Sequence, residues 1–218
     1  MARYAWIAYA APMALFALLT AAESTAPISW YAAVYTAKAA IVTAALIAGL
    51  RVWRPDVRMD TRALPMAVIV GLAVFAEWVL VERWLPYPHL GHRSAYNPFL
   101  AIQDPAMRGA FIAVRFYGLA LMVPVMEELF WRDLAIRWLT RPDFRSVPIG
   151  VFSAAAFWLV AAGFGLEHPE WVAAVICAAA YAALLWRTRS LGACMVAHAT
   201  TNLALGVYVI MTGEWKYW

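Results

Sequence analysis

The chain has 218 residues, of which 65% are hydrophobic and 14% are charged. A soluble globular domain carries about 25% charged residues, so this composition excludes an ordinary soluble enzyme and indicates an integral membrane protein. The formal net charge of +4 comes almost entirely from arginine. In a membrane protein such an excess reports loop topology rather than nucleic-acid binding, and we expect no nucleic-acid partner.

Seven apolar runs are long enough to cross a bilayer, which takes about 20 helical residues. They use most of the chain and leave no room for a soluble domain. We therefore predict an all-α, polytopic helical bundle with about seven transmembrane helices, forming a single transmembrane domain over residues 1–218. The predicted spans are residues 4–22, 30–50, 64–84, 108–127, 147–167, 170–187 and 191–211.

The first run has two interpretations. Arg3, the apolar stretch and the small residues Thr20 to Ala22 resemble a secretory signal with a cleavage site. The run is longer than a usual signal core and is followed by six more spans, which favours a retained helix. With Arg3 inside, most arginines of the predicted loops fall on one side, so the positive-inside rule places the N-terminus inside and the C-terminus outside.

Two adjacent carboxylates, Glu127 and Glu128, lie at the end of the fourth apolar run. A charge at the centre of a spanning helix costs roughly 2.5–3.5 kcal/mol, which suggests a use for them. Glu128 and Arg132 are four residues apart in the favourable order for an ion pair, and Glu127 is left without a local partner as a candidate general base. Pro124 should kink the helix beside the acids. Alternatively, the acids mark an interfacial helix end that meets an arginine-rich inner loop.

Two further polar islands lie downstream in apolar surroundings. His198 and Asn202 are four residues apart and share one helical face of the last span. Both side chains can donate hydrogen bonds to a developing oxyanion, or they can simply cross-link membrane helices. His168 lies at the turn between the fifth and sixth spans, where a lone histidine is more often structural or solvated, so its functional interpretation depends on the other motifs.

Taken in order, these three islands resemble the CPBP (CAAX protease and bacteriocin-processing) family of intramembrane glutamic-type endopeptidases, which includes the type II CAAX-processing enzymes. The resemblance covers about residues 108–211, the motif-bearing core. The tail, with AHATTNLALGVYV and TGEWKYW, is similar more narrowly to the CAAX-protease-related proteins found with bacterial exosortase sorting systems. The matching motifs are EExxxR from Glu127 to Arg132, FxxxH from Phe164 to His168, and HxxxN from His198 to Asn202.

The resemblance implies an intramembrane protease that cuts a peptide bond near the membrane-anchored end of a protein or peptide. In this family the first Glu and the FxxxH histidine activate water, and the HxxxN pair stabilises the oxyanion. The family was long suspected of binding zinc, and two His with two Glu can form such a site. We rank a metal lower, because Glu128 has Arg132 as a partner and Asn is a poor zinc ligand, and we expect no cofactor. The implied catalytic residues are Glu127, Glu128, His168, His198 and Asn202, with Arg132 as a structural ion-pair partner.

The expected partners are a membrane-anchored or lipidated peptide substrate, the lipid bilayer and, through the narrower likeness, an exosortase-system protein. The expected location is a bacterial inner (cytoplasmic) membrane. One feature fits poorly, because the predicted topology puts Glu127 toward the inner side and His168 at the outer end of its span. We therefore predict that the fifth span is irregular near Gly163 and Gly165, or that the helix boundaries are misplaced.

Two other classes of function stay open on the sequence. A non-catalytic relative would bind or scaffold membrane peptides without cutting them, although every motif position is occupied here. A proton-coupled transporter would also use intramembrane Glu and His, but the chain shows no internal repeat of the kind that builds many transporters. The protease is the preferred interpretation.

Overall fold

The computed structural model describes residues 4–218, and within them every regular element is helical. The predicted all-α fold is confirmed, and by length and composition the chain is a multi-pass membrane protein. Arg3, on which the predicted topology partly rested, lies outside the described residues. Six helical segments of the described chain are long and apolar enough to cross a membrane: Ile7–Thr25, Ile28–Asp56, Thr61–Trp84, Pro105–Thr140, Trp171–Thr188 and Leu191–Thr212.

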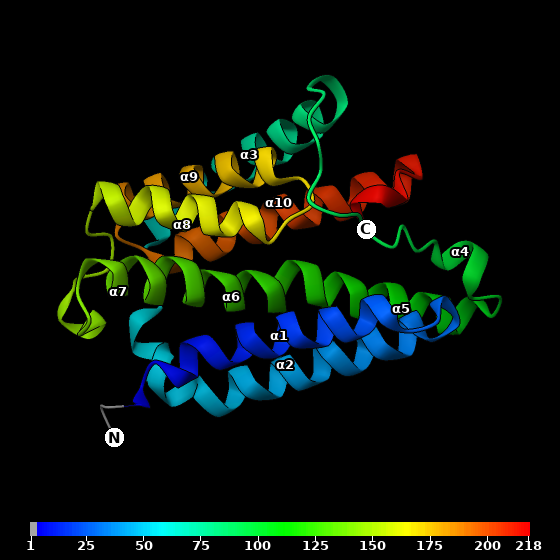
Figure 1. Cartoon of the computed structure of the whole chain (residues 1–218), viewed down its shortest axis with the longest axis horizontal. Coiled ribbons are helices and arrows are strands. Elements are labelled where there is room, and N and C mark those ends of the chain that lie inside the picture. Colours follow the sequence, from blue (N-terminus) through cyan, green and yellow to red (C-terminus); the bar gives the residue numbers. More distant parts are fainter. Residues whose placement is uncertain (1–3) are drawn as a thin grey trace.

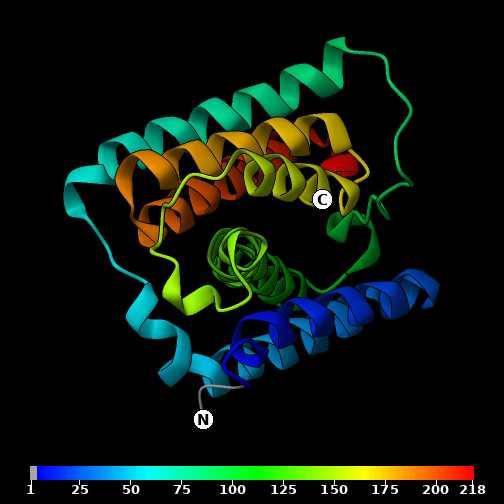
Figure 2. The ribbon, with the colours of Figure 1, turned by 60° about the vertical axis from the view of Figure 1, so that its left-hand side comes forward.

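The helices form three layers around one long central helix (Figures 1 and 2). An antiparallel N-terminal hairpin packs on one side of the central helix, and a group of four helices packs on the other. A long connection that includes the short helix α4 joins α3 to the central helix. The hairpin consists of α1 (Ile7–Thr25) and α2 (Tyr31–Trp53), and the four-helix group consists of α3 (Leu64–Trp84), α8 (Ala154–Leu166), α9 (Trp171–Thr188) and α10 (Leu191–Thr212), with α4 at Pro98–Ala101.

The central helix contains two π-helical segments, one before and one after the start of the EExxxR motif. In the first segment the N–H of Val123 bonds to the carbonyl of Gly118, a spacing of five residues instead of four. Continuing that spacing would pair the carbonyl of Leu119 with Pro124, which has no N–H. The helix runs as α5 (Pro105–Tyr117), a π-helical segment (Gly118–Met122), α6 (Val123–Glu127), a second π-helical segment (Glu128–Ala135) and α7 (Ile136–Thr140).

The fifth predicted span is wrong at its start. Residues 147–153 are not helical, and α8 begins only at Ala154, with Ser153 as its N-cap. Pro148 and the positive φ of Gly150 explain the late start, since neither suits a helix interior. The 13-residue helix is about 20 Å long, against a hydrocarbon core of about 30 Å, so the α8–α9 turn ends short of the outer ends of α3 and α10 (Figure 1).

The short α8 removes the misfit between Glu127 and His168. Glu127 lies thirteen residues before Thr140, the end of the central helix, and α8 is also thirteen residues long. At 1.5 Å per residue both the acid and the turn that carries His168 therefore lie about 20 Å from the inner ends of their helices. The helix continues through Gly163 and Gly165, so the predicted irregularity at those glycines is wrong, and the misplaced boundary is the correct alternative.

Buried polar contacts fix the inner end of the central helix. Arg137 lies inside the helix, forms an ion pair with Asp133 and donates from Nε to the carbonyls of Phe144 (3.0 Å) and Val147 (2.8 Å). These bonds hold the turn that leads into α8. Arg132 is fully buried in the same helix, so neither arginine lies in an inner loop, and the positive-inside pattern rests on fewer loop arginines.

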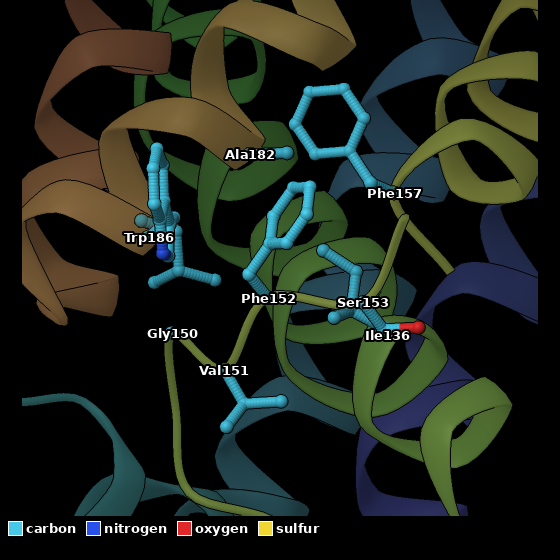
Figure 3. A pocket seen from close by; sticks show the side chains of 9 residues that line it. Ile136, Gly150, Val151, Phe152, Ser153, Phe157, Ala182 and Trp186 are labelled. Carbon is cyan, nitrogen blue, oxygen red and sulfur yellow. The ribbon is translucent and has the colours of Figure 1, made fainter. Parts of the chain in front are cut away.

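A small pocket lies where α8 starts late (Figure 3). Its volume is about 10 Å³, close to the space that one water occupies. Its walls are mainly apolar, formed by residues 150–153 with Phe157, Trp186 and their neighbours. None of the residues of the three motifs lines it, so it is a packing gap at the inner end of the bundle and not part of the candidate site.

Candidate active site

The EExxxR acids lie in the middle of the central helix, enclosed by the four-helix group. Glu127 keeps 5% of its surface exposed and Glu128 none. A buried carboxylate is costly unless it is paired or hydrogen-bonded, and the two acids meet this requirement differently. Glu128 has a hydrogen-bond partner at one oxygen and an ion-pair partner at the other, whereas Oε2 of Glu127 has no hydrogen bond.

Glu128 joins two of the three motifs. Its Oε1 accepts a hydrogen bond from Nδ1 of His198 at 2.9 Å, and its Oε2 lies 3.3 Å from Nε of Arg132. The central helix and α10 are therefore connected through a single buried carboxylate. The Arg132 contact has the i, i+4 spacing from which we expected it.

The guanidinium group of Arg132 is held by two aromatic rings as well as by its ion pair with Glu128. Its guanidinium carbon lies 4.6 Å from the ring centroid of Phe164 and 5.4 Å from that of Tyr181, within cation–π range. Its three guanidinium nitrogens have no hydrogen-bond partner among the described residues. The FxxxH phenylalanine thus contacts the EExxxR arginine directly, which links the second motif to the first.

Glu127 faces the second nitrogen of the same histidine. Its Oε2 lies 3.9 Å from Nε2 of His198, too far for a hydrogen bond but close enough for one water molecule to contact both atoms. Because Nδ1 of His198 donates to Glu128, the neutral ring carries its lone pair on Nε2. An acid without a hydrogen bond at Oε2 and an imidazole lone pair therefore converge on one point.

His168 lies at the α8–α9 turn among aromatic rings. Its Nδ1 is 2.9 Å from the carbonyl of Phe164, which assigns the proton to Nδ1 and leaves Nε2 free. Its ring stacks on Phe164 with centroids 4.6 Å apart and meets Trp78 edge-on at 5.6 Å. Among the described contacts, no hydrogen bond or ion pair joins His168 to Glu127, and Phe164 packs against both the His168 ring and the guanidinium of Arg132.

Asn202 lies one turn beyond His198 on α10, and its amide is already engaged. Nδ2 donates to the carbonyl of Leu119 at 2.8 Å, the carbonyl that would otherwise point at Pro124. The carboxamide has a second N–H, which is free for another acceptor. Asn202 therefore ties α10 to the π-helical segment that precedes Glu127.

Glu167 is a site residue that the sequence reasoning did not single out. Its Oε2 accepts a hydrogen bond from the indole of Trp131 at 3.1 Å. Trp131 lies within the EExxxR motif, directly before Arg132, and Glu167 lies within the FxxxH motif, directly before His168. The only available signal was a carboxylate beside the FxxxH histidine.

The long outer loop also reaches the site. Arg93 forms a bidentate ion pair with Glu170, from Nε at 2.9 Å and from Nη2 at 2.8 Å. The backbone N–H of Leu90 donates to the carbonyl of Pro169 at 3.0 Å. Trp171 donates from its indole to Pro88. These contacts fasten residues 88–93 over the α8–α9 turn (Figures 1 and 2).

Within residues 4–218, no three His, Cys, Asp or Glu side chains are grouped so as to hold a metal ion. The two cysteines, Cys177 and Cys194, are buried and free. The acid cluster is instead completed by an arginine and a histidine.

Comparison with protein families gives a match to the motif-bearing part of the chain. Residues 109–204 match the family described as Type II CAAX prenyl endopeptidase Rce1-like. Part of the chain is therefore similar to Rce1-like endopeptidases. The matched segment includes all three motifs and covers a little under half of the chain, and the family is one of peptidases. No curated protein and no solved structure gave a significant match.

The matched segment begins in α5 and ends in α10, so it includes most of the central helix, all of α8 and α9, and much of α10. The N-terminal hairpin and α3 lie outside the matched segment, although α3 packs tightly on α10. A Cβ at Gly71 of α3 would lie 2.7 Å from Cβ of Thr200, so only glycine permits this close approach.

Proposed function

We propose that the chain is an intramembrane endopeptidase that hydrolyses a peptide bond near the membrane-anchored end of its substrate. The observation that carries this proposal is the convergence of the Glu127 carboxylate and the Nε2 lone pair of His198 across 3.9 Å. Both residues lie inside the segment that matches a peptidase family. A water molecule held between them would lose a proton to Glu127 as it attacks the peptide carbonyl.

In this mechanism Glu128 and Arg132 are positioning residues. Glu128 fixes the Nδ1–H tautomer of His198, and the rings of Phe164 and Tyr181 fix the guanidinium of Arg132. Arg132 balances the charge of Glu128, so the site carries one paired and one reactive carboxylate. The arrangement resembles other catalytic groups in which a second side chain orients the base.

The tetrahedral intermediate requires hydrogen-bond donors, each worth several kcal/mol in acyl transfer. Asn202 is the proposed oxyanion donor through its second amide N–H, and a protonated His198 would be the other donor. The free Nε2 of His168 is assigned to the far side of the substrate, where it orients the attacking water or the peptide. A hydrated cavity among the helices of the matched segment would admit both water and substrate.

The substrate is proposed to be a membrane-anchored or lipidated peptide, because the acids are buried at mid-depth in a bundle of membrane-spanning helices. The narrower placement, beside a bacterial exosortase sorting system in the inner membrane, rests on the sequence of the C-terminal tail alone. It predicts that the substrate is a sorted or secreted protein.

The test compares the termini of membrane proteins by mass spectrometry in cells that carry the native chain or Glu127→Gln at equal abundance. Glu214→Gln is the matched control, because Glu214 is exposed near the C-terminus. A precursor that stays uncut only with Glu127→Gln supports the peptidase and names its substrate. Identical termini in all three strains would reject proteolysis and favour a binding role.

A further inference from the structure

The carboxylate of Glu167 lies at the edge of the site and forms no ion pair within the described chain. Glu167 follows the last residue of α8 and is exposed, and its one side-chain hydrogen bond comes from the indole of Trp131. At the depth of Glu127 an exposed charge would cost a few kcal/mol against lipid, so this side of the α8–α9 turn faces water. Glu167 therefore marks where the site opens.

Trp131 connects Glu167 to the reactive acid. Trp131 is four residues after Glu127 in the π-helical segment, so its side chain covers the same face of the central helix. The tip of its ring lies so close to α8 that a Cβ at Gly163 would approach it to 2.9 Å. The indole thus spans from the central helix to α8, and it holds the carboxylate of Glu167 on the face that Glu127 occupies.

Hydrolysis also needs a proton donor for the leaving group, and the only proton assigned so far is the one that Glu127 takes from water. Breaking the C–N bond releases an amine, which must be protonated as it leaves. The Nδ1–H of His168 is committed to the carbonyl of Phe164, and that of His198 is committed to Glu128. Arginine does not give up its proton in proteins, which excludes Arg132.

We propose that Glu167 is a further catalytic residue, the general acid that protonates the leaving amine. This proposal rests on the proposed function. Glu127 takes a proton from water, the hydroxide adds to the carbonyl carbon, and the C–N bond breaks as the carboxylic acid of Glu167 gives its proton to nitrogen. Water then returns the proton from Glu127 to Glu167, so peptide and water become acid and amine with no other reactant.

The chemistry of the side chain agrees with this role. Desolvation of its carboxyl group raises the pKa of Glu167 to about 7, although the residue keeps an exposed edge, and the Trp131 hydrogen bond acts in the opposite direction. A group with this pKa is partly protonated near neutral pH. A general acid must be protonated, so cleavage is expected to fall as the pH rises through this pKa.

The test uses the full chain in detergent micelles and two synthetic probes. The first probe is a peptide that spans the cut site identified by comparing native cells with Glu127→Gln cells. The second is its ester analogue, in which oxygen replaces the scissile nitrogen. An alcohol leaves with little need for a proton, so Glu167→Gln is expected to cut the peptide 10²–10⁴-fold more slowly and the ester within about tenfold of native. Glu127→Gln is expected to lose both reactions, because it removes the base.

The possible failures are distinguishable. Equal loss of peptide and ester cleavage in Glu167→Gln would reduce Glu167 to a structural residue, and unchanged peptide cleavage would overturn the proposal outright. In either case native cleavage with an inactive Glu127→Gln would leave the proposed function standing. Trp131→Phe provides an independent readout: loss of the indole donor raises the pKa of Glu167, so the high-pH limb of the rate profile should move upward, and an unmoved limb would contradict the assignment.

Discussion

The amide of Asn202 donates a hydrogen bond to the carbonyl of Leu119 at 2.8 Å, across the interface between α10 and the central helix. That carbonyl lacks its helical partner, because the π-helical spacing directs it at Pro124. A buried acceptor without a donor costs about 1–3 kcal/mol. The third motif therefore satisfies a defect that proline creates five residues after Leu119, one turn before the acids.

This relationship predicts a measurable coupling. Asn202→Ala should lower the free energy of unfolding by about 1–2 kcal/mol, and Pro124→Ala should offset about 1 kcal/mol of that loss by supplying an N–H at position 124. Thermal unfolding of the two single variants and the double variant in detergent measures the coupling. Additive effects would show that the Asn202 bond does not substitute for the missing N–H.

The same variants separate stability from chemistry. If Asn202 also donates its second N–H to the oxyanion, the double variant should regain stability while cleavage stays at least 10²-fold below native. Recovery of cleavage together with stability would assign Asn202 to positioning alone.

The residue spacing in the sequence predicts the site contacts within one helix, but it does not predict the contacts between helices. Four-residue spacing placed Glu128 with Arg132 and His198 with Asn202, because one helical turn determines which side chains share a face. Spacing says nothing of partners on other helices, so the contacts of Glu128 with His198 and of Trp131 with Glu167 were not predictable.

The predicted start of α8 was wrong for a different reason. Residues 147–153 are apolar, and hydropathy does not distinguish an apolar loop from an apolar helix. Pro148 and Gly150 were the available signals of a late start. Recognising them would have placed His168 at the level of Glu127 without any bend in the helix.

The Arg132–Glu128 pair predicts a large and specific loss of stability. Arg132→Met should cost about 3–5 kcal/mol, because it leaves Glu128 buried and without its cation. Adding Glu128→Gln should recover part of the loss by removing the charge. Unfolding in detergent measures both changes, with Arg141→Met as the control, since Arg141 is exposed at the end of the same helix. A loss below 1 kcal/mol for Arg132→Met would contradict the buried pair.

The Arg93–Glu170 pair predicts local opening of the outer loop. Because the pair is partly exposed, with 30% of the Arg93 side chain accessible, its contribution should be about 1 kcal/mol. Arg93→Ala should then speed amide hydrogen exchange in residues 88–93 about fivefold, and the reversed pair Arg93→Glu with Glu170→Arg should restore part of the protection. Arg83→Ala removes an exposed arginine nearby and should have no effect. Exchange at the native rate in Arg93→Ala would show that the loop is held by its backbone contacts alone.

His168 predicts a pH dependence of stability whose sign follows from its surroundings. Burial, followed by the positive charge of Arg93, lowers the pKa of His168 to about 4, against about 6.5 in an unfolded chain. Between these values the unfolded chain binds a proton that the folded chain does not, so stability is complete above about pH 6.5 and falls as the pH drops toward 4. The loss attributable to His168 is at most about 3 kcal/mol. His168→Gln cannot titrate, and its unfolding temperature should depend less on pH than that of the native chain over this window. Parallel curves would mean that His168 is protonated as readily in the folded chain as in the unfolded one.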